Sequence, residues 1–262
     1  MNPTSTFILV AFLFAVATAT PQPNQDTPED PEPVVNVTTC GGFVEASSAS
    51  IEFQLGGSIR ADMRCVWIIR PSYLFQRFNL VSSGLLGTDG LFLSARSRGG
   101  ITPQEKLDTI GQNVTMYHRT LILTLSVGHA PTQGFKLEFY SSGSPQNSDL
   151  SGHALLTEAK GNYTYPVNGG QYGNNENALF AIAPSVPGQP TLRFSRVDLE
   201  NDSGCMRDPV RIFNWFDNGY LEVARFCGST IPTSVTFQDG AGLILFVTDA
   251  SLTATGFEFQ YE

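Results

Sequence analysis

Charged side chains are scarce in this sequence. Asp, Glu, Lys and Arg make up 15% of its 262 residues, against roughly 25% in an ordinary soluble domain. Lys and Arg number 15 and Asp and Glu 24, which gives a net charge of −9 at pH 7. This balance argues against nucleic-acid binding, because affinity for a phosphate backbone comes from Lys and Arg displacing counterions. It also disfavours an anionic membrane surface and favours basic partners and divalent cations.

Motifs for catalysis or cofactor binding are missing as well. His118, His129 and His153 are far apart and form no His-x-His or His-Glu-x-x-His pattern. The sequence has no Gly-x-Ser-x-Gly elbow and no phosphate-binding Gly-Lys-Ser/Thr. Acids are numerous enough to include a glycosidase-type carboxylate pair, so an enzyme stays an alternative. We predict a protein without catalytic activity.

Long apolar runs are confined to the N-terminus. Residues 7–17 read FILVAFLFAVA, which is shorter than the about 20 residues that cross a bilayer. The small-x-small triplet Ala17-Thr18-Ala19 follows and resembles a cleavage site. We therefore predict a signal peptide over residues 1–19, no membrane span, and a secreted, extracellular product. Residues 20–39 are Pro-rich and acidic with little to bury, which predicts a disordered leader.

Sequons and cysteines agree with a secretory route. Four Asn-x-Ser/Thr sequons are candidate glycan sites on surface loops: Asn36, Asn113, Asn162 and Asn201. The four cysteines form two distant groups, Cys40 with Cys65 and Cys205 with Cys227. An even number of cysteines in an oxidising compartment predicts two disulfides. Sequence alone allows three pairings, and the spacing favours pairing within each group.

The chain repeats itself at an offset of 122 residues. Leu121-Ile122-Leu123 recurs as Leu243-Ile244-Leu245, and Gly134-Phe135 recurs as Gly256-Phe257. Each Gly-Phe begins a run in which apolar and polar residues alternate. This period of two is typical of a strand that has one packed face and one wet face.

The repeat and its surroundings predict the domain organisation and the fold class. Residues 142–152 have the composition of a linker, which separates predicted domains at residues 40–141 and 153–262. Within each domain, short alternating runs are separated by turn residues, and no window shows helical periodicity over three turns. These features predict an all-β fold, most simply two consecutive β-sandwiches.

Ordered motifs in both halves resemble the CUB domain, an extracellular antiparallel β-sandwich of jelly-roll type. The first copy has Cys40-Gly41-Gly42 and Cys65-Val66-Trp67-Ile68-Ile69-Arg70-Pro71, and the second has Cys205 and Phe226-Cys227-Gly228. Each copy thus keeps one of the family's two cysteine pairs. The resemblance covers residues 40–262. It implies disulfides Cys40–Cys65 and Cys205–Cys227.

The resemblance also implies a calcium site in the second copy. Many CUB domains bind calcium through a Glu, an Asp soon after the third cysteine, and an Asp after the penultimate strand; Glu200, Asp208 and Asp249 match these positions. Calcium takes about six to eight oxygen ligands, which three carboxylates with carbonyls and water can supply. The alternative is a solvated acidic loop. Arg207 departs from the family's Tyr and could pair with Asp208 or Glu200 and weaken binding.

In the first copy, Val81 replaces the expected Glu, so calcium is predicted in the second domain only. The resemblance further implies that the calcium loops hold a basic side chain, commonly Lys, of an extracellular protein. Two other functions stay open. One is carbohydrate or lipid binding, with Trp215 and Tyr172 as candidate ligand contacts and glycans as partners. The other is a non-catalytic modulator of an extracellular protease.

Overall fold

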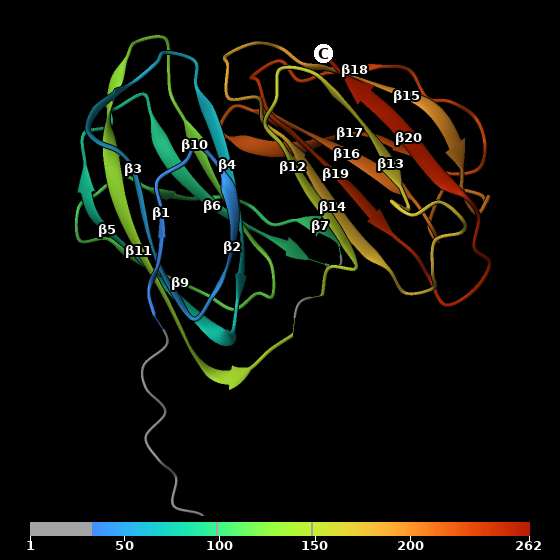
Figure 1. The fold of residues 1–262 in the computed structure, drawn as a ribbon, viewed down its shortest axis with the longest axis horizontal. Helices are drawn as coiled ribbons and strands as arrows, with labels where there is room; N and C mark the ends of the chain where they lie inside the picture. The colour runs from blue at the N-terminus through green and yellow to red at the C-terminus, as the bar shows by residue number, and fades with distance from the viewer. Residues whose placement is uncertain (1–32, 98, 148) are drawn as a thin grey trace, which may run out of the picture. The chain divides into compact units, whose positions relative to one another are not determined.

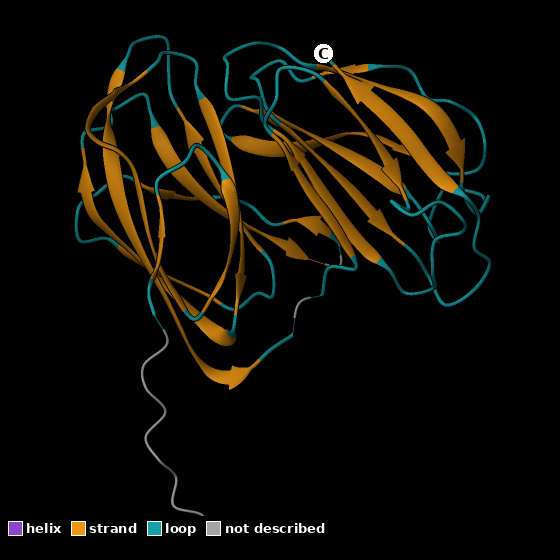
Figure 2. Cartoon of the chain, in the orientation of Figure 1, coloured by secondary structure: helices purple, strands orange, loops and turns teal. Residues whose placement is uncertain are grey.

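The fold, a computed structural model, is described for residues 33–97, 99–147 and 149–262. These residues form twenty strands in four sheets and contain no helix (Figures 1 and 2). The predicted all-β fold is confirmed. Within the same residues there is accordingly no helix long and apolar enough to cross a membrane. The predicted signal peptide, residues 1–19, lies outside the described residues.

Two sheets come from the first half of the chain. Sheet I has the strand order β1 (Val35–Val37), β3 (Ser48–Ile59), β11 (Thr132–Pro145), β5 (Tyr73–Ser83) and β9 (Asn113–Met116). Sheet II has the order β2 (Gly42–Ala46), β4 (Arg64–Pro71), β10 (Leu121–Ser126), β6 (Gly90–Ser97) and β7 (Gly100–Ile101), and β8 (Glu105–Leu107) also pairs with β6. Both sheets contribute to one core, in which the Trp67 and Phe135 ring centroids are 5.9 Å apart. We call them the first sheet pair.

The second half of the chain forms two more sheets. Sheet III has the order β12 (Gly152–Leu156), β14 (Asn177–Ile182), β19 (Gly242–Val247), β16 (Val210–Phe216) and β17 (Gly219–Phe226). Sheet IV has the order β13 (Gly161–Tyr165), β20 (Gly256–Tyr261), β15 (Thr191–Asp198) and β18 (Val235–Thr236). Their shared core is rich in aromatic rings, with Phe180, Phe246 and Phe257 fully buried. We call them the second sheet pair.

The sequence repeats occupy matching places in the two sheet pairs. The Leu-Ile-Leu repeats form the middle strands β10 and β19. The Gly-Phe repeats lie in β11 and β20, next to a neighbouring strand's backbone. A Cβ atom on Gly134 would lie 2.0 Å from the Gln54 carbonyl oxygen, and one on Gly256 would lie 2.1 Å from that of Tyr165. Both glycines are therefore required by close backbone approach.

Both disulfides implied by the resemblance are present. Cys40–Cys65 joins the segment before β2 to β4 in the first sheet pair. Cys205–Cys227 joins the turn before β16 to the residue after β17 in the second. Each bridge therefore stays within one sheet pair.

A third apolar cluster joins sheet II to sheet III. It consists of side chains from both sheets that do not belong to either core, among them Val66, Ile68, Phe92, Ile122, Leu179, Phe213, Trp215 and Leu243. Strands of these sheets are consequently buried on both faces, which explains their nearly continuous apolar runs. A hydrogen bond of 2.9 Å between the Thr124 and Tyr220 hydroxyls crosses the same interface.

Two predicted boundaries are wrong in detail. The predicted disordered leader ends in a strand, because Val35–Val37 pairs in parallel with β3 and adds an edge to sheet I. The predicted linker at residues 142–152 begins inside β11, which pairs with β5 as far as Pro145. Local composition missed both because backbone pairing with distant strands outweighs weak local propensity.

Three of the four sequons lie elsewhere than predicted. Asn36, Asn113 and Asn162 are in strands β1, β9 and β13 rather than in loops. Asn201 is in the loop between β15 and β16. All four asparagines are exposed, as an acceptor requires.

Candidate metal centre

Three acidic residues occupy two connections of the second sheet pair, the β15–β16 loop and the segment between β19 and β20. Glu200 lies two residues after β15, Asp208 lies two residues before β16, and Asp249 follows β19. The Cys205–Cys227 disulfide ties the loop that carries the first two to the residue after β17. The backbone of Glu200 is held by Gly228, whose N–H donates to the Glu200 carbonyl at 3.3 Å. The strand ends and the disulfide thus fix the backbone positions of the acidic residues.

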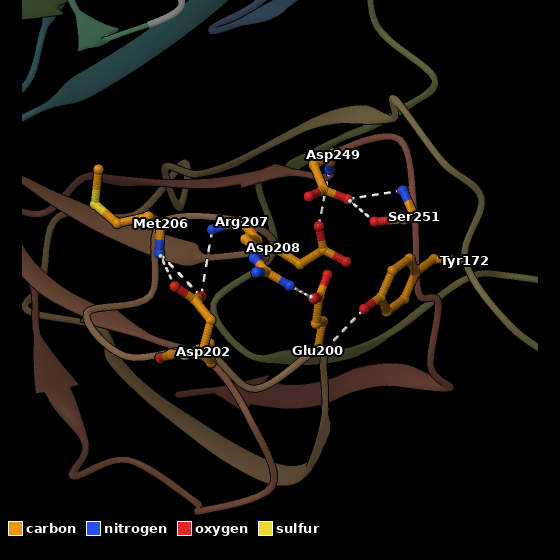
Figure 3. Close-up of polar contacts among 9 residues, drawn as sticks. Tyr172, Glu200, Asp202, Met206, Arg207, Asp208, Asp249 and Ser251 are labelled. Atoms are coloured by element: carbon orange, nitrogen blue, oxygen red, sulfur yellow. Dashed lines mark hydrogen bonds and ion pairs between the residues drawn. The ribbon is translucent and has the colours of Figure 1, made fainter.

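The three carboxylates converge. One oxygen from each of Glu200, Asp208 and Asp249 lies within 4.8 Å of the others, and Figure 3 shows the groups pointing toward one another. Two oxygens bound to one calcium ion at about 2.3–2.6 Å each can be at most about 5.2 Å apart. The spacing therefore fits a shared cation. It brings together residues that are up to 49 positions apart in the sequence.

Two of these carboxylates are buried and incompletely paired. The Glu200 side chain is 4% exposed and Asp208 is 0% exposed. Among the described residues, Glu200 Oε2 and Asp208 Oδ2 have no hydrogen-bond partner. An unpaired buried carboxylate oxygen is costly, and a bound cation is one of the few ways to satisfy it. The donor set therefore fits a hard divalent cation such as calcium.

Two other oxygens of the cluster accept backbone hydrogen bonds. Asp208 Oδ1 accepts the Asp249 backbone N–H at 2.8 Å, and Asp249 Oδ1 accepts the Ser251 backbone N–H at 2.8 Å. These bonds fix the Asp249–Ser251 turn against Asp208. Sequence reasoning did not identify Ser251, whose only signal is its place two residues after Asp249.

Arg207 pairs with the cluster, as its position suggested. Its Nη1 donates to Glu200 Oε1 at 2.7 Å, and this hydrogen bond raises the pKa of Arg207. The Arg207 side chain is 52% exposed, whereas its Glu200 partner is buried. The Arg207 backbone N–H donates to Asp202 Oδ1 at 3.3 Å, so the backbone has its own anchor. The guanidinium can therefore leave Glu200 without the loop moving.

Burial and neighbouring acids disfavour the charged form of Asp208. Burial raises the pKa of Asp208, and the neighbouring charges of Glu200 and Asp249 raise it further. The Asp249 N–H opposes this by stabilising the charged form. A divalent cation would favour all three charged forms together.

Tyr172 has a different role from the one predicted. Its side chain is buried, 2% exposed, so the hypothesis of a surface ligand contact is wrong. Its hydroxyl accepts the Glu200 backbone N–H at 2.9 Å, and burial raises its pKa. Tyr172 therefore positions the segment that carries Glu200.

Trp215 is likewise unavailable to a ligand. It is 1% exposed and belongs to the cluster between sheets II and III. Its ring meets Phe92 of the first sheet pair, with centroids 5.4 Å apart. The hypothesis of a carbohydrate contact at Trp215 is wrong, because the hairpin pattern reveals an aromatic residue but not the second sheet that covers it.

In the first sheet pair, Asp89 precedes β6 much as Asp208 precedes β16 in the second, but its carboxylate has other partners. Asp89 is buried at 2% exposure, and its oxygens accept the backbone N–H groups of Leu86 and Gly128, each at 2.8 Å. Backbone donors thus occupy both oxygens of this carboxylate.

Comparison with known proteins agrees with this geometry. Residues 151–261 match the family model described as CUB domain. The match covers the segment that forms the second sheet pair, from β12 to β20.

Curated relatives extend the similarity over both halves. Human "Cubilin" is 39% identical over 232 residues, which is 83% of this chain but 6% of that protein. Human "Procollagen C-endopeptidase enhancer 2" is 24% identical over 257 residues, covering 94% of this chain and 61% of that protein. The chain thus spans a small fraction of cubilin and less than two thirds of the enhancer.

Among solved structures, a MASP-1 CUB2 domain described as bound to Ca2+ is 25% identical. The match covers 41% of this chain and 96% of that domain, with a TM-score of 0.37.

Proposed function

We propose that this chain is a secreted, non-catalytic binding protein built from two consecutive CUB-type β-sandwiches, residues 35–145 and 152–261. The second sandwich binds calcium through Glu200, Asp208 and Asp249. That face then holds a basic side chain of an extracellular protein. The exposed sequons carry N-linked glycans.

One observation carries the metal part of the proposal. Glu200 and Asp208 each have a buried carboxylate oxygen without a hydrogen-bond partner among the described residues, and one oxygen of each lies within 4.8 Å of one oxygen of Asp249. A solvated acidic loop, the alternative, would leave its oxygens in water. Here Glu200 and Asp208 are withdrawn from bulk solvent, so a bound cation would offset the cost of their buried charge.

Different residues would bind the metal and contact the partner. Glu200 and Asp208 are buried and would hold the ion, whereas Asp249 is half-buried and reaches the surface. Bound calcium would keep the carboxylates ionised and fixed in place. An ammonium or guanidinium group from a partner would then gain a charge-assisted hydrogen bond from an acceptor that needs no reorganisation. The chain's net charge of −9 favours approach of a basic partner.

Calorimetric titration of the secreted protein with calcium tests the metal site. We expect saturation with a dissociation constant of about 0.1–1 mM, the range of extracellular calcium modules. Asp208→Ala should abolish the heat, because it removes the most deeply buried ligand. Asp202→Asn is the matched control: its carboxylate accepts the Met206 and Arg207 backbone N–H groups and lies outside the cluster. It should leave calcium binding unchanged.

A second readout is thermal stability. Calcium at 100 times its dissociation constant should stabilise the fold by about 2.7 kcal/mol, and a chelator should reverse the shift. Absence of both heat and melting shift would identify the cluster as an acidic loop without a metal. It would also remove the basis for a calcium-dependent partner.

A second candidate function is modulation of an extracellular protease without catalysis. It is favoured by similarity over 94% of this chain to a protein named as an enhancer of an endopeptidase. The experiment is a cleavage assay of procollagen by its C-endopeptidase with and without this protein. An unchanged rate at saturating protein would contradict this candidate.

A further inference from the structure

Three of the four sequons lie on strands that end a sheet. β1 with Asn36 and β9 with Asn113 are the two terminal strands of sheet I, and β13 with Asn162 is a terminal strand of sheet IV. A terminal strand presents unpaired backbone N–H and C=O groups along one side. Such a row is a template on which another chain can add a strand.

These three strands lack most of the usual protection of an edge, although β1 has only three residues. Their sequences are VNV, NVTM and GNYTY, without a charged residue or a proline. Proteins ordinarily protect edges with Lys, Pro, bulges, very short strands or a covering element. Apolar side chains are also exposed near them, with Val35 at 37% and Tyr117, one residue after β9, at 58%. The edges are thus open, uncharged and partly apolar.

The other terminal strands in the described part of the chain are protected in ordinary ways. β17 carries the ion pair between Glu222 and Arg225, at 2.9 Å. β7 and β18 are two residues long, and β8 contains Glu105 and Lys106.

β2 and β12 protect each other. The ring centroids of Phe43 in β2 and His153 in β12 are 4.5 Å apart, and Leu155 of β12 packs on the cluster between sheets II and III. The open uncharged edges of the described structure are therefore the strands that carry a sequon.

We propose that N-linked glycans on Asn36, Asn113 and Asn162 keep the edges of sheets I and IV from pairing with another copy of this chain. The donor is a lipid-linked oligosaccharide diphosphate. The sugar C1–O bond to the diphosphate breaks, a C1–N bond to the asparagine Nδ2 forms, that nitrogen loses one proton, and the lipid diphosphate leaves. The resulting hydrated, bulky chain excludes an incoming strand where other proteins use charge.

Asn201 provides the matched control within the same molecule. It is exposed, but it lies in the loop between β15 and β16, beside Gly228, and not in a strand. A glycan there covers no open backbone row. Its removal should leave self-association unchanged, which separates edge protection from a general effect of glycans on solubility.

The experiment expresses the full chain through a secretory pathway. Glycopeptide mass spectrometry measures occupancy at each sequon, and light scattering after size-exclusion chromatography measures the molar mass over a concentration series. We expect occupancy at Asn36, Asn113 and Asn162 and a monomer. The triple Asn→Gln variant at these positions should form dimers or larger species, while Asn201→Gln stays monomeric.

A rescue variant makes the mechanism specific. Asn→Lys at the same three positions also removes the glycans but supplies the charge that protects other edges, and it should stay monomeric. If the Asn→Gln variant is not secreted, enzymatic deglycosylation of the folded wild-type protein replaces it. Unoccupied edge sequons overturn the proposal. So does a deglycosylated protein that remains monomeric, or a Lys variant that associates as strongly as the Gln variant.

Discussion

At the scale of single residues, the candidate metal centre differs from a simple acidic cluster in two side chains. Arg207 supplies a positive charge to Glu200 from the solvent side, and Tyr172 supports Glu200 from the core. Neither is a metal ligand. Both are expected to change how strongly the carboxylates bind calcium, in opposite directions.

Arg207→Gln should strengthen calcium binding about fivefold. The guanidinium competes with the ion for Glu200 Oε1 and repels it, and solvent around this half-exposed group keeps the effect to a few fold. Calorimetric titration measures the change. Arg225→Gln is the control, because Arg225 pairs with Glu222 rather than with the cluster. Equal affinities for wild type and Arg207→Gln would show that the guanidinium does not compete.

Tyr172→Phe should weaken calcium binding and lower stability. It removes the acceptor of the Glu200 backbone N–H and leaves that buried group unpaired, at a cost of about 1–3 kcal/mol. Titration and thermal unfolding should both respond. Tyr117→Phe, at an exposed ring, should change neither. Wild-type calcium affinity in the Tyr172→Phe variant would contradict the positioning role.

At the scale of elements, close packing between strands explains why the two halves repeat certain residues. Gly134 and Gly256 recur at the same offset because each lies against the backbone of a neighbouring strand. The aromatic residues that follow them enter the cores. The Gly-Phe repeat therefore results from a packing requirement that both sheet pairs share.

Gly256→Ala and Gly134→Ala should each destabilise the fold by more than about 2 kcal/mol, because the added methyl group overlaps a backbone carbonyl that cannot move aside. Gly256 also has φ near +80°, which disfavours any side chain. Gly87→Ala is the control, since a Cβ there meets nothing within 4 Å. Urea unfolding measures the differences. Equal midpoints for Gly87→Ala and the two repeat variants would refute the packing argument.

At the scale of the whole molecule, the described residues of the two sheet pairs share an apolar interface. Sheets II and III each bury one face in their own core and the other against the opposite sheet. Trp215 and Phe92 lie in this interface. A protein of this construction should unfold with coupling between its halves.

Trp215→Ala should lower the free energy of unfolding by about 3–5 kcal/mol, because it empties a large buried site. Phe216→Ala, next in sequence but 54% exposed, should cost about 0.5 kcal/mol or less. Calorimetric unfolding also reports on coupling: we expect one transition in the wild type and two in the Trp215 variant. Two well-separated transitions in the wild type would show that the interface does not couple the halves.

The sequence by itself determined the all-β fold class, the repeat and the acidic residues of the candidate site. Strand periodicity and turn residues are local, and the spacing of cysteines and carboxylates matched an ordered family pattern. Only the tertiary structure decided that the side chains of Glu200, Asp208 and Trp215 are buried. It also decided that the Tyr172 hydroxyl bonds the backbone of Glu200. These features depend on contacts between segments tens of residues apart. The period of the apolar residues and the composition of the chain do not encode such contacts. The same reason places Asn36, Asn113 and Asn162 on sheet edges: a strand becomes an edge only when the order of the whole sheet is fixed.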